Sequence, residues 1–176
     1  MTEPAAHSAV SETPTAGRPP LADRVFDLLV GNWTIEREIT PKGNFRGSAS
    51  FVRADAKTLI YAEEGTLVLN DGTSMVGERK HTYLLHEDRI EVLFADGPND
   101  GNHFVDILFP ADPDADWPLC SGDTHYCLKD TYKAMFCFET EDEFDITYTV
   151  CGPEKDYVSR SVYRRLKPLG NLAAAG

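Results

Sequence analysis

Between residues 33 and 166 the chain consists of short segments in which apolar and polar residues alternate, and turn-forming residues separate nearly all of them. The turns contain Gly, Pro, Asn and Asp, as in Asn70-Asp71-Gly72. Ten successive segments with no long helical pattern between them favour an antiparallel barrel or a sandwich. We predict an all-β fold, an antiparallel up-and-down β-barrel. The predicted strands are 33–40, 45–54, 57–69, 74–86, 89–95, 102–109, 123–128, 132–139, 143–151 and 157–166.

The regions that flank or interrupt these strands differ from them in composition. Apolar residues in 20–29 follow helical spacing, which predicts a short N-terminal helix capping one end of the barrel. Residues 1–20 are rich in Ala, Ser, Thr, Glu and Pro, and we expect disordered tails there and at 169–176. Residues 21–168 then form a single domain. The irregular segment 110–122 is interpreted as a lid, a solvated linker or a loop that docks on the barrel.

The 17 basic and 29 acidic residues give a formal net charge of −12, which limits the classes of partner. An acidic surface repels phosphate backbones and anionic bilayers, so we expect neither nucleic acid nor a membrane as partner. No long apolar stretch and no signal-peptide pattern occurs, and we expect a cytoplasmic monomer or homodimer. Cysteines in that compartment stay reduced. We therefore predict free thiols at Cys120, Cys127, Cys137 and Cys151.

Alternation also predicts which side chains face the interior, because residues i and i+2 of a strand share a face. The first strand, for example, places Trp33, Ile35 and Arg37 on one side. An unpaired buried charge is costly, so inward polar groups must pair with one another, with water or with a ligand. They indicate either a hydrated ligand pocket or a self-satisfied network that braces the barrel. The polar residues on the predicted inner faces are Arg37, Glu63, Arg79, His81, Tyr83, His103 and Tyr148.

The densest group of chemically active residues lies in 123–132, where His125 and Cys127 share one face of a predicted strand. Together with His103 or Asp130 they offer donors for zinc, and a Cys–His pair can also act as a nucleophile. Such pairs are common on strands by chance, so we predict no metal and no cofactor. We favour a hydrogen-bonded rim, or an acid–base group for a bound substrate, formed by His125, Asp130 and Tyr132.

The two ends of the barrel sequence suggest how the cylinder closes. Trp33 provides a large apolar plug whose face an arginine of the last strand can cover. Tyr163 and Arg165 share one face of that strand, and in an alternative interpretation they hold the acid group of a ligand. Lys155, in the preceding turn, either reaches an anionic ligand at the mouth or lies in solvent.

Four stretches, taken together, resemble a family of uncharacterised single-domain proteins of bacteria and fungi. They are Leu29-Val30-Gly31-Asn32-Trp33, Tyr61-Ala62-Glu63-Glu64-Gly65, His125 to Tyr132, and Gly152 to Tyr157 followed by Tyr163-Arg164-Arg165. The resemblance implies a lipocalin-like (calycin-type) barrel and carries no activity. The Gly-Asn-Trp start is also similar to nitrobindin-type haem barrels, but the late histidine that ligates iron there is lacking, since no histidine follows His125. With fatty-acid-binding proteins only the architecture is shared.

These observations predict a lipocalin-like barrel that binds a small, partly apolar molecule with an acidic or phenolic group. One alternative is a cofactor-independent isomerase, cyclase or decarboxylase. His103 or His125 would then be its general base, Glu63 or Asp130 the orienting group, and Tyr61 or Tyr148 the proton donor. Another alternative is a structural or assembly subunit with a filled barrel. The predicted ligand-binding residues are Trp33, Arg37, Arg79, His81, Tyr83, Phe94, Tyr132, Phe136, Tyr148, Tyr163 and Arg165.

Overall fold

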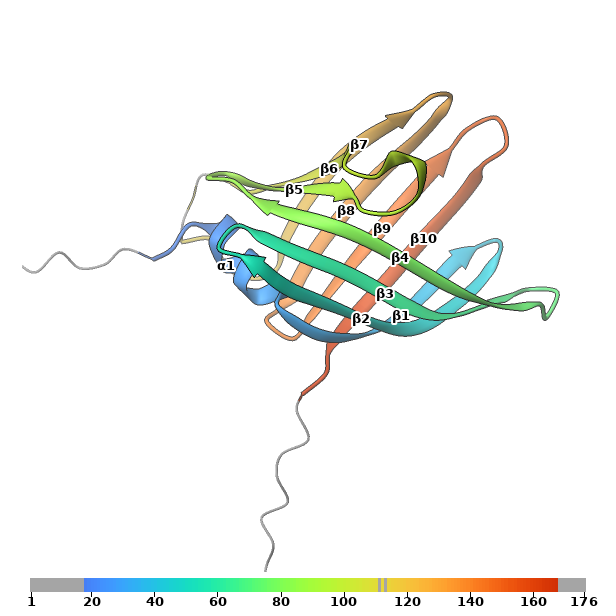
Figure 1. Cartoon of the computed structure of the whole chain (residues 1–176), viewed down its shortest axis with the longest axis horizontal. Helices are drawn as coiled ribbons and strands as arrows, with labels where there is room; N and C mark the ends of the chain where they lie inside the picture. Colours follow the sequence, from blue (N-terminus) through green and yellow to red (C-terminus); the bar gives the residue numbers. More distant parts are fainter. Residues whose placement is uncertain (1–17, 111, 113, 168–176) are drawn as a thin grey trace, which may run out of the picture.

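The computed structural model describes residues 18–110, 112 and 114–167, and it confirms the predicted up-and-down barrel (Figure 1). All strand pairs are antiparallel, and the sheet order is β6-β5-β4-β3-β2-β1-β10-β9-β8-β7. The expected tails fall largely outside the described residues. Within these residues no helix is long and apolar enough to cross a bilayer. The elements are α1 (Leu21–Leu29), β1 (Gly31–Thr40), β2 (Gly43–Asp55), β3 (Thr58–Leu69), β4 (Ser74–Leu85), β5 (Arg89–Phe94), η1 (Gly97–Asn99), β6 (His103–Leu108), β7 (Leu119–Cys127), β8 (Asp130–Thr140), β9 (Glu143–Cys151) and β10 (Asp156–Arg165).

The end of the barrel beside α1 is filled with apolar side chains. Trp33 is fully buried there, and its indole N–H donates to the carbonyl oxygen of Leu29 at 2.9 Å. The Trp33 ring packs edge-on against Phe144, with 4.8 Å between the ring centroids. The amphipathic helix α1 lies over this core, as Figure 1 shows at one end of the barrel. Its buried residues are Leu21, Ala22, Val25, Phe26 and Leu29.

Arg165, near the end of β10, completes this closed end. Its guanidinium carbon lies 4.2 Å from the centroid of a Trp33 ring, and its nitrogens donate to the carbonyl oxygens of Leu28 (2.5 Å) and Val30 (2.9 Å). Carbonyl groups at the C-terminus of a helix lack hydrogen-bond donors within the helix, and Arg165 provides these donors. The geometry agrees with the interpretation in which an arginine covers Trp33.

The connection between β6 and β7 also lies on the closed end. Arg24 of α1 donates to the carbonyl oxygen of Ala115 at 3.1 Å, and its guanidinium lies 5.6 Å from the Trp117 ring centroid. The described part of this connection therefore docks on the helix, which leaves the lid interpretation without support. Residues 119–122, predicted as irregular, are the first residues of β7.

The barrel closes between β6 and β7 without the backbone ladder that joins the other neighbouring strands. Side chains of β7 replace the ladder. The Asp106 N–H donates to the Asp123 carboxylate and the Leu108 N–H to the Ser121 hydroxyl, both at 2.7 Å. Backbone N–H groups at a covered sheet edge require such acceptors. We call the junction of β6 and β7 the seam.

A β-bulge between β5 and β6 reverses the predicted orientation of two side chains. The register shifts between Val92 and Leu93, and Phe104 is the extra residue on β6. Phe104 is buried, whereas the His103 side chain is 47% exposed. Alternation predicts the reverse. The predicted inward orientation of His103 is wrong, because one inserted residue inverts the phase of the strand.

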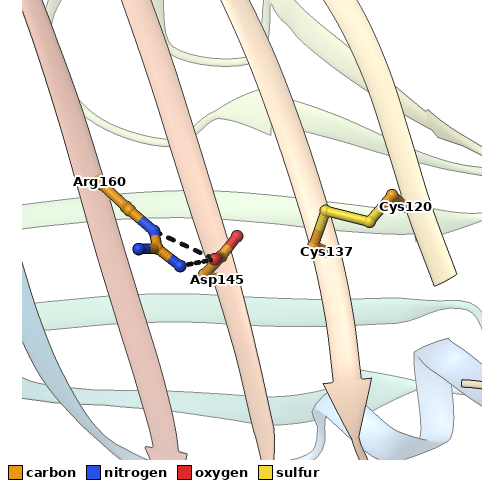
Figure 2. Close-up of a disulfide and its surroundings, with 4 residues drawn as sticks. All are labelled: Cys120, Cys137, Asp145 and Arg160. Atoms are coloured by element: carbon orange, nitrogen blue, oxygen red, sulfur yellow. Dashed lines mark hydrogen bonds and ion pairs between the residues drawn. A yellow bond between two sulfur atoms is a disulfide. The ribbon is translucent and has the colours of Figure 1, made fainter. Parts of the chain in front are cut away.

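Two of the four cysteines form a disulfide, which corrects the prediction that all are free. Cys120 of β7 lies directly opposite Cys137 of β8, and the two sulfurs are bonded (Figure 2). The prediction of free thiols rested on the expected compartment and took no account of strand pairing, and the assignment of Cys120 to a loop left its partner on β8 unseen. Cys127 and Cys151 carry free thiols. Figure 2 also shows Arg160 of β10 bound to Asp145 of β9, at 2.7 Å.

Candidate functional site

A cavity of about 470 Å³ opens at the end of the barrel opposite α1. This volume lies within the range of roughly 300–1,000 Å³ that is typical of small-molecule sites. The interior is thus filled beside α1 and hollow at the other end, which disfavours the filled-barrel alternative. The lining residues are Arg37, Ile39, Lys42, Arg79, His81, Phe94, Asp96, Asn99, Phe104, His125, Cys127, Tyr132, Tyr148, Val150, Lys155, Tyr157 and Ser159.

Aromatic side chains form one wall of the cavity, with Phe104 at its centre. The Phe104 ring is stacked on His81, with 5.5 Å between centroids and 5° between planes. Its centroid lies 4.6 Å from that of Phe94, 5.3 Å from that of His125 and 5.6 Å from that of Tyr148. Packed rings hold one another in place, so this wall offers a preformed apolar surface to a ligand.

A buried polar network lies below the aromatic wall and separates the cavity from the closed end. The Arg37 guanidinium binds both carboxylate oxygens of Glu63, at 2.9 and 2.6 Å, and its Nε donates to Ser161 at 2.6 Å. The Tyr61 hydroxyl donates to Glu63 and lies 3.0 Å from the Tyr163 hydroxyl. Burial alone would raise the pKa of Glu63, but its hydrogen bonds to Arg37 and the charge of Arg37 hold the pKa below its ordinary value. The self-satisfied network that the sequence suggests is therefore present.

Four of the lining residues are basic and one is acidic, although the whole chain carries a net charge of −12. The charge of Arg37 is matched by Glu63, and that of Lys155 by Asp130, whose carboxylate lies 2.7 Å from the ammonium. Arg79 forms no hydrogen bond or ion pair with any residue that the structure describes. Arg79 is exposed and lies across from Glu63 on β3 without a direct bond to it, so its guanidinium nitrogens remain open to a ligand.

Two rims of the cavity carry lysines. Lys42, in the β1–β2 turn, places its ammonium 4.2 Å from the centroid of the Tyr157 ring. Lys155, in the β9–β10 turn, donates to the Tyr132 hydroxyl at 2.8 Å. The hydroxyl proton of Tyr132 is then free to be donated to a ligand, because Lys155 occupies an oxygen lone pair. Both rims thus present donors or positive charge to the opening.

The two histidines of the cavity are in their neutral form near pH 7. Burial, with the charge of Arg79, lowers the pKa of His81 to about 4. The Nδ1 atom of His81 lies 3.1 Å from the carbonyl oxygen of Leu93, so the neutral ring carries its proton there. Partial burial, with the proximity of His103, also lowers the pKa of His125. Neither ring adds positive charge to the site.

The structure brings only some of the predicted ligand-binding residues to the cavity. Trp33 and Arg165 belong to the closed end and do not line it. Three others are buried in the core, namely Tyr83, Phe136 and Tyr163. Alternation gives the face of a strand on which a residue lies, but it does not separate a hollow part of a barrel from a filled one. The predicted residues that do line the cavity are Arg37, Arg79, His81, Phe94, Tyr132 and Tyr148.

The acid–base group of the enzyme alternative is not assembled among the described residues. His125 lines the cavity, whereas His103 lies outside it. Asp130 is paired with Lys155 and Glu63 with Arg37, so neither carboxylate is engaged with His125. Of the two proposed proton donors, Tyr61 is buried in the polar network, whereas Tyr148 lines the cavity.

Sequence reasoning missed several residues of the cavity. Phe104 was hidden by the bulge, which no local pattern reveals. Lys42 and Tyr157 lie next to each other at the mouth, and their contact depends on the pairing of β1 with β10. Lys42 belongs to the turn that follows β1, so the alternation that places Arg37 and Ile39 on the inner face gives no signal for it.

Comparison with known proteins identifies the family and the fold. Residues 29–165 match the profile of a family described as "Family of unknown function (DUF6314)". No curated protein matches the chain. The chain is similar in structure to the S-type phycobiliprotein lyase CPES from Guillardia theta, at 12% identity and a TM-score of 0.59, over 83% of this chain and 93% of that one. It is also similar to Rv2717c from M. tuberculosis, at 11% identity and a TM-score of 0.59, over 85% and 99%. At these identities the similarity shows a shared barrel fold.

Proposed function

The chain belongs to the DUF6314 family of unknown function, and we propose that its barrel binds a small, partly apolar molecule that carries an acidic or phenolic group. The observation that carries this proposal is the unpaired Arg79 beside a preformed aromatic wall, in a cavity of about 470 Å³. The aromatic rings accept the apolar part of the ligand, and Arg79 accepts its anionic group. A phenolic oxygen would accept hydrogen bonds from the same arginine and from the hydroxyl of Tyr132.

Charge supports an anionic ligand over a neutral or cationic one. Basic side chains outnumber acidic ones in the cavity lining, whereas the chain as a whole has a net negative charge. The cavity therefore attracts anions that the rest of the protein repels. Arg is suited to this task because its planar guanidinium binds a carboxylate through two parallel hydrogen bonds. A hydrogen bond to a charged group contributes about 1.5–3 kcal/mol, which corresponds to roughly a 10- to 100-fold gain in affinity.

A pair of fluorescent probes tests the proposal. 8-Anilinonaphthalene-1-sulfonate is an anionic aromatic molecule, and N-phenyl-1-naphthylamine has the same rings without the sulfonate. We expect the anionic probe to bind at least 10-fold more tightly than the neutral one, and Arg79→Met to remove this preference while the neutral probe still binds.

Lys80→Met is the matched control, because it removes the same charge from the adjacent residue of β4. Lys80 lies on the outer face of the strand and lines no part of the cavity. The preference for the anionic probe should survive in this variant. Equal binding of the two probes by the unmodified protein, or equal losses in the two variants, would refute the proposal.

A further inference from the structure

Three donor side chains meet at the seam on the β6 side of the barrel, outside the cavity. They are His103 and Asp106 of β6 and Asp123 of β7, and one ligand atom from each lies within 4.8 Å of the other two. This set differs from the donors suggested by the sequence, which were centred on His125 and Cys127. From these residues we propose a binding site for a divalent transition-metal ion such as Zn²⁺, held by one imidazole and two carboxylates.

The bulge at Phe104 creates this arrangement. In a regular strand, residues three apart point to opposite faces. Because the bulge adds one residue between His103 and Asp106, both side chains lie on the same face, with Nε2 of His103 3.4 Å from Oδ1 of Asp106. Two donors bound tetrahedrally to zinc, with bonds of about 2.0–2.1 Å, are about 3.3 Å apart. The first pair of ligand atoms therefore already has the separation that an ion requires.

One oxygen of the Asp106 carboxylate lacks a hydrogen-bond partner among the described residues, and a bound metal ion would provide a partner for it. Its Oδ1 atom is buried and has no hydrogen-bond partner in the described part of the chain. Arg89 Nε, 3.4 Å away, is likewise buried without a hydrogen bond. One arginine does not balance two carboxylates, so the group keeps an excess negative charge when the imidazole is neutral. A cation bound to Oδ1 neutralises this charge, and Arg89 remains as a partner outside the metal ligands.

Binding at this position would join the two edges of the barrel that no backbone ladder joins. His103 and Asp106 belong to β6, and Asp123 to β7, where its carboxylate already accepts the Asp106 N–H. An ion held by both strands binds the folded chain and loses its ligand set on unfolding. The ion therefore acts as a structural clasp of the seam, and its effect is measurable as stability.

Thermal unfolding of the full chain, first stripped with EDTA and then titrated with Zn²⁺, tests the site. At a concentration 100-fold above the dissociation constant we expect the Tm to rise by roughly 5–10 °C. His103→Ala should fold with nearly the Tm of the stripped protein, since its side chain is half exposed, and should lose the rise. Asp123→Asn, which keeps an acceptor for the Asp106 N–H, should bind Zn²⁺ at least 10-fold more weakly.

His86→Ala is the matched control, because His86 is also partly exposed and lies 2.9 Å from an acidic partner, Glu91. This variant should keep the rise in Tm. Titration with Co²⁺ adds a second readout, since a thiolate ligand produces an intense near-ultraviolet charge-transfer band and a His–Asp–Asp site does not. No rise in Tm, a rise that persists in His103→Ala, or a thiolate band that assigns the ion to Cys127 would each overturn the proposal.

Discussion

Replacing Glu63 by Gln should destabilise the barrel by about 3 kcal/mol, because the buried Arg37 guanidinium then loses its counter-charge. The carboxylate binds Arg37 through two hydrogen bonds, and the two side chains are only 4% and 10% exposed. Removal of one partner from a buried pair costs about 3–5 kcal/mol. We expect the lower end of this range, since Arg37 borders the cavity and water can approach it.

Urea unfolding at pH 7 measures this effect. With a urea dependence of about 2 kcal/mol per M, the midpoint should fall by about 1.5 M. The double variant Arg37→Met with Glu63→Met removes both charges and should recover most of the loss. Glu143→Gln is the control, because the pair of Glu143 with Arg164 is half exposed and contributes less than about 1 kcal/mol. A Glu63→Gln variant no less stable than this control would refute the view that the network braces the barrel.

Three further predictions concern pH, the closed end and a close contact. The pKa of His81 is about 4 in the folded protein, below its value of 6.5 in the unfolded chain, so on acidification the unfolded chain takes up the proton first. The free energy of unfolding should therefore be highest above pH 6.5 and fall by about 3 kcal/mol as the pH drops to 4. His81→Phe should remove this part of the pH dependence of the free energy of unfolding. Arg165→Met should cost about 2–3 kcal/mol in urea unfolding because helix carbonyl groups lose their donors, whereas exposed Arg164→Met should cost less than about 1 kcal/mol. Gly65→Ala should lower the Tm, since the added methyl group would lie 2.6 Å from the Phe45 ring; an unchanged Tm would contradict this packing.

The architecture was predictable because the strand pattern is local. Alternation and turn residues place the ten strands to within a few residues, except that β7 begins four residues earlier than predicted. Its first residues follow a stretch rich in Pro and Asp, a composition that predicts a loop. The same error left the pairing of Cys120 with Cys137 unseen, since only the register of β7 and β8 places the two cysteines opposite each other, while the prediction of free thiols itself rested on the expected compartment.

The site was predictable only in part, because it depends on how far along the barrel each inward residue lies and on which strands are neighbours. Alternation turns Arg37, Arg79 and Arg165 inward alike, yet they serve a bracing network, an open cavity and the closed end respectively. Which arginine lacks a partner is decided by neighbours on other strands. The exchange of His103 for Phe104 on the inner face likewise arises from the pairing of β6 with β5 and has no trace in the sequence of β6 alone.

Nuclear magnetic resonance of the isotope-labelled protein, titrated with 8-anilinonaphthalene-1-sulfonate, tests most directly whether the hollow end is the binding site. The account predicts shifts concentrated at the backbone amides of Arg79, Phe104 and His125, with the indole N–H of buried Trp33 unchanged. Shifts gathered instead on the outer face around Ser48 and Glu78, where a second and more open hollow lies, would contradict it.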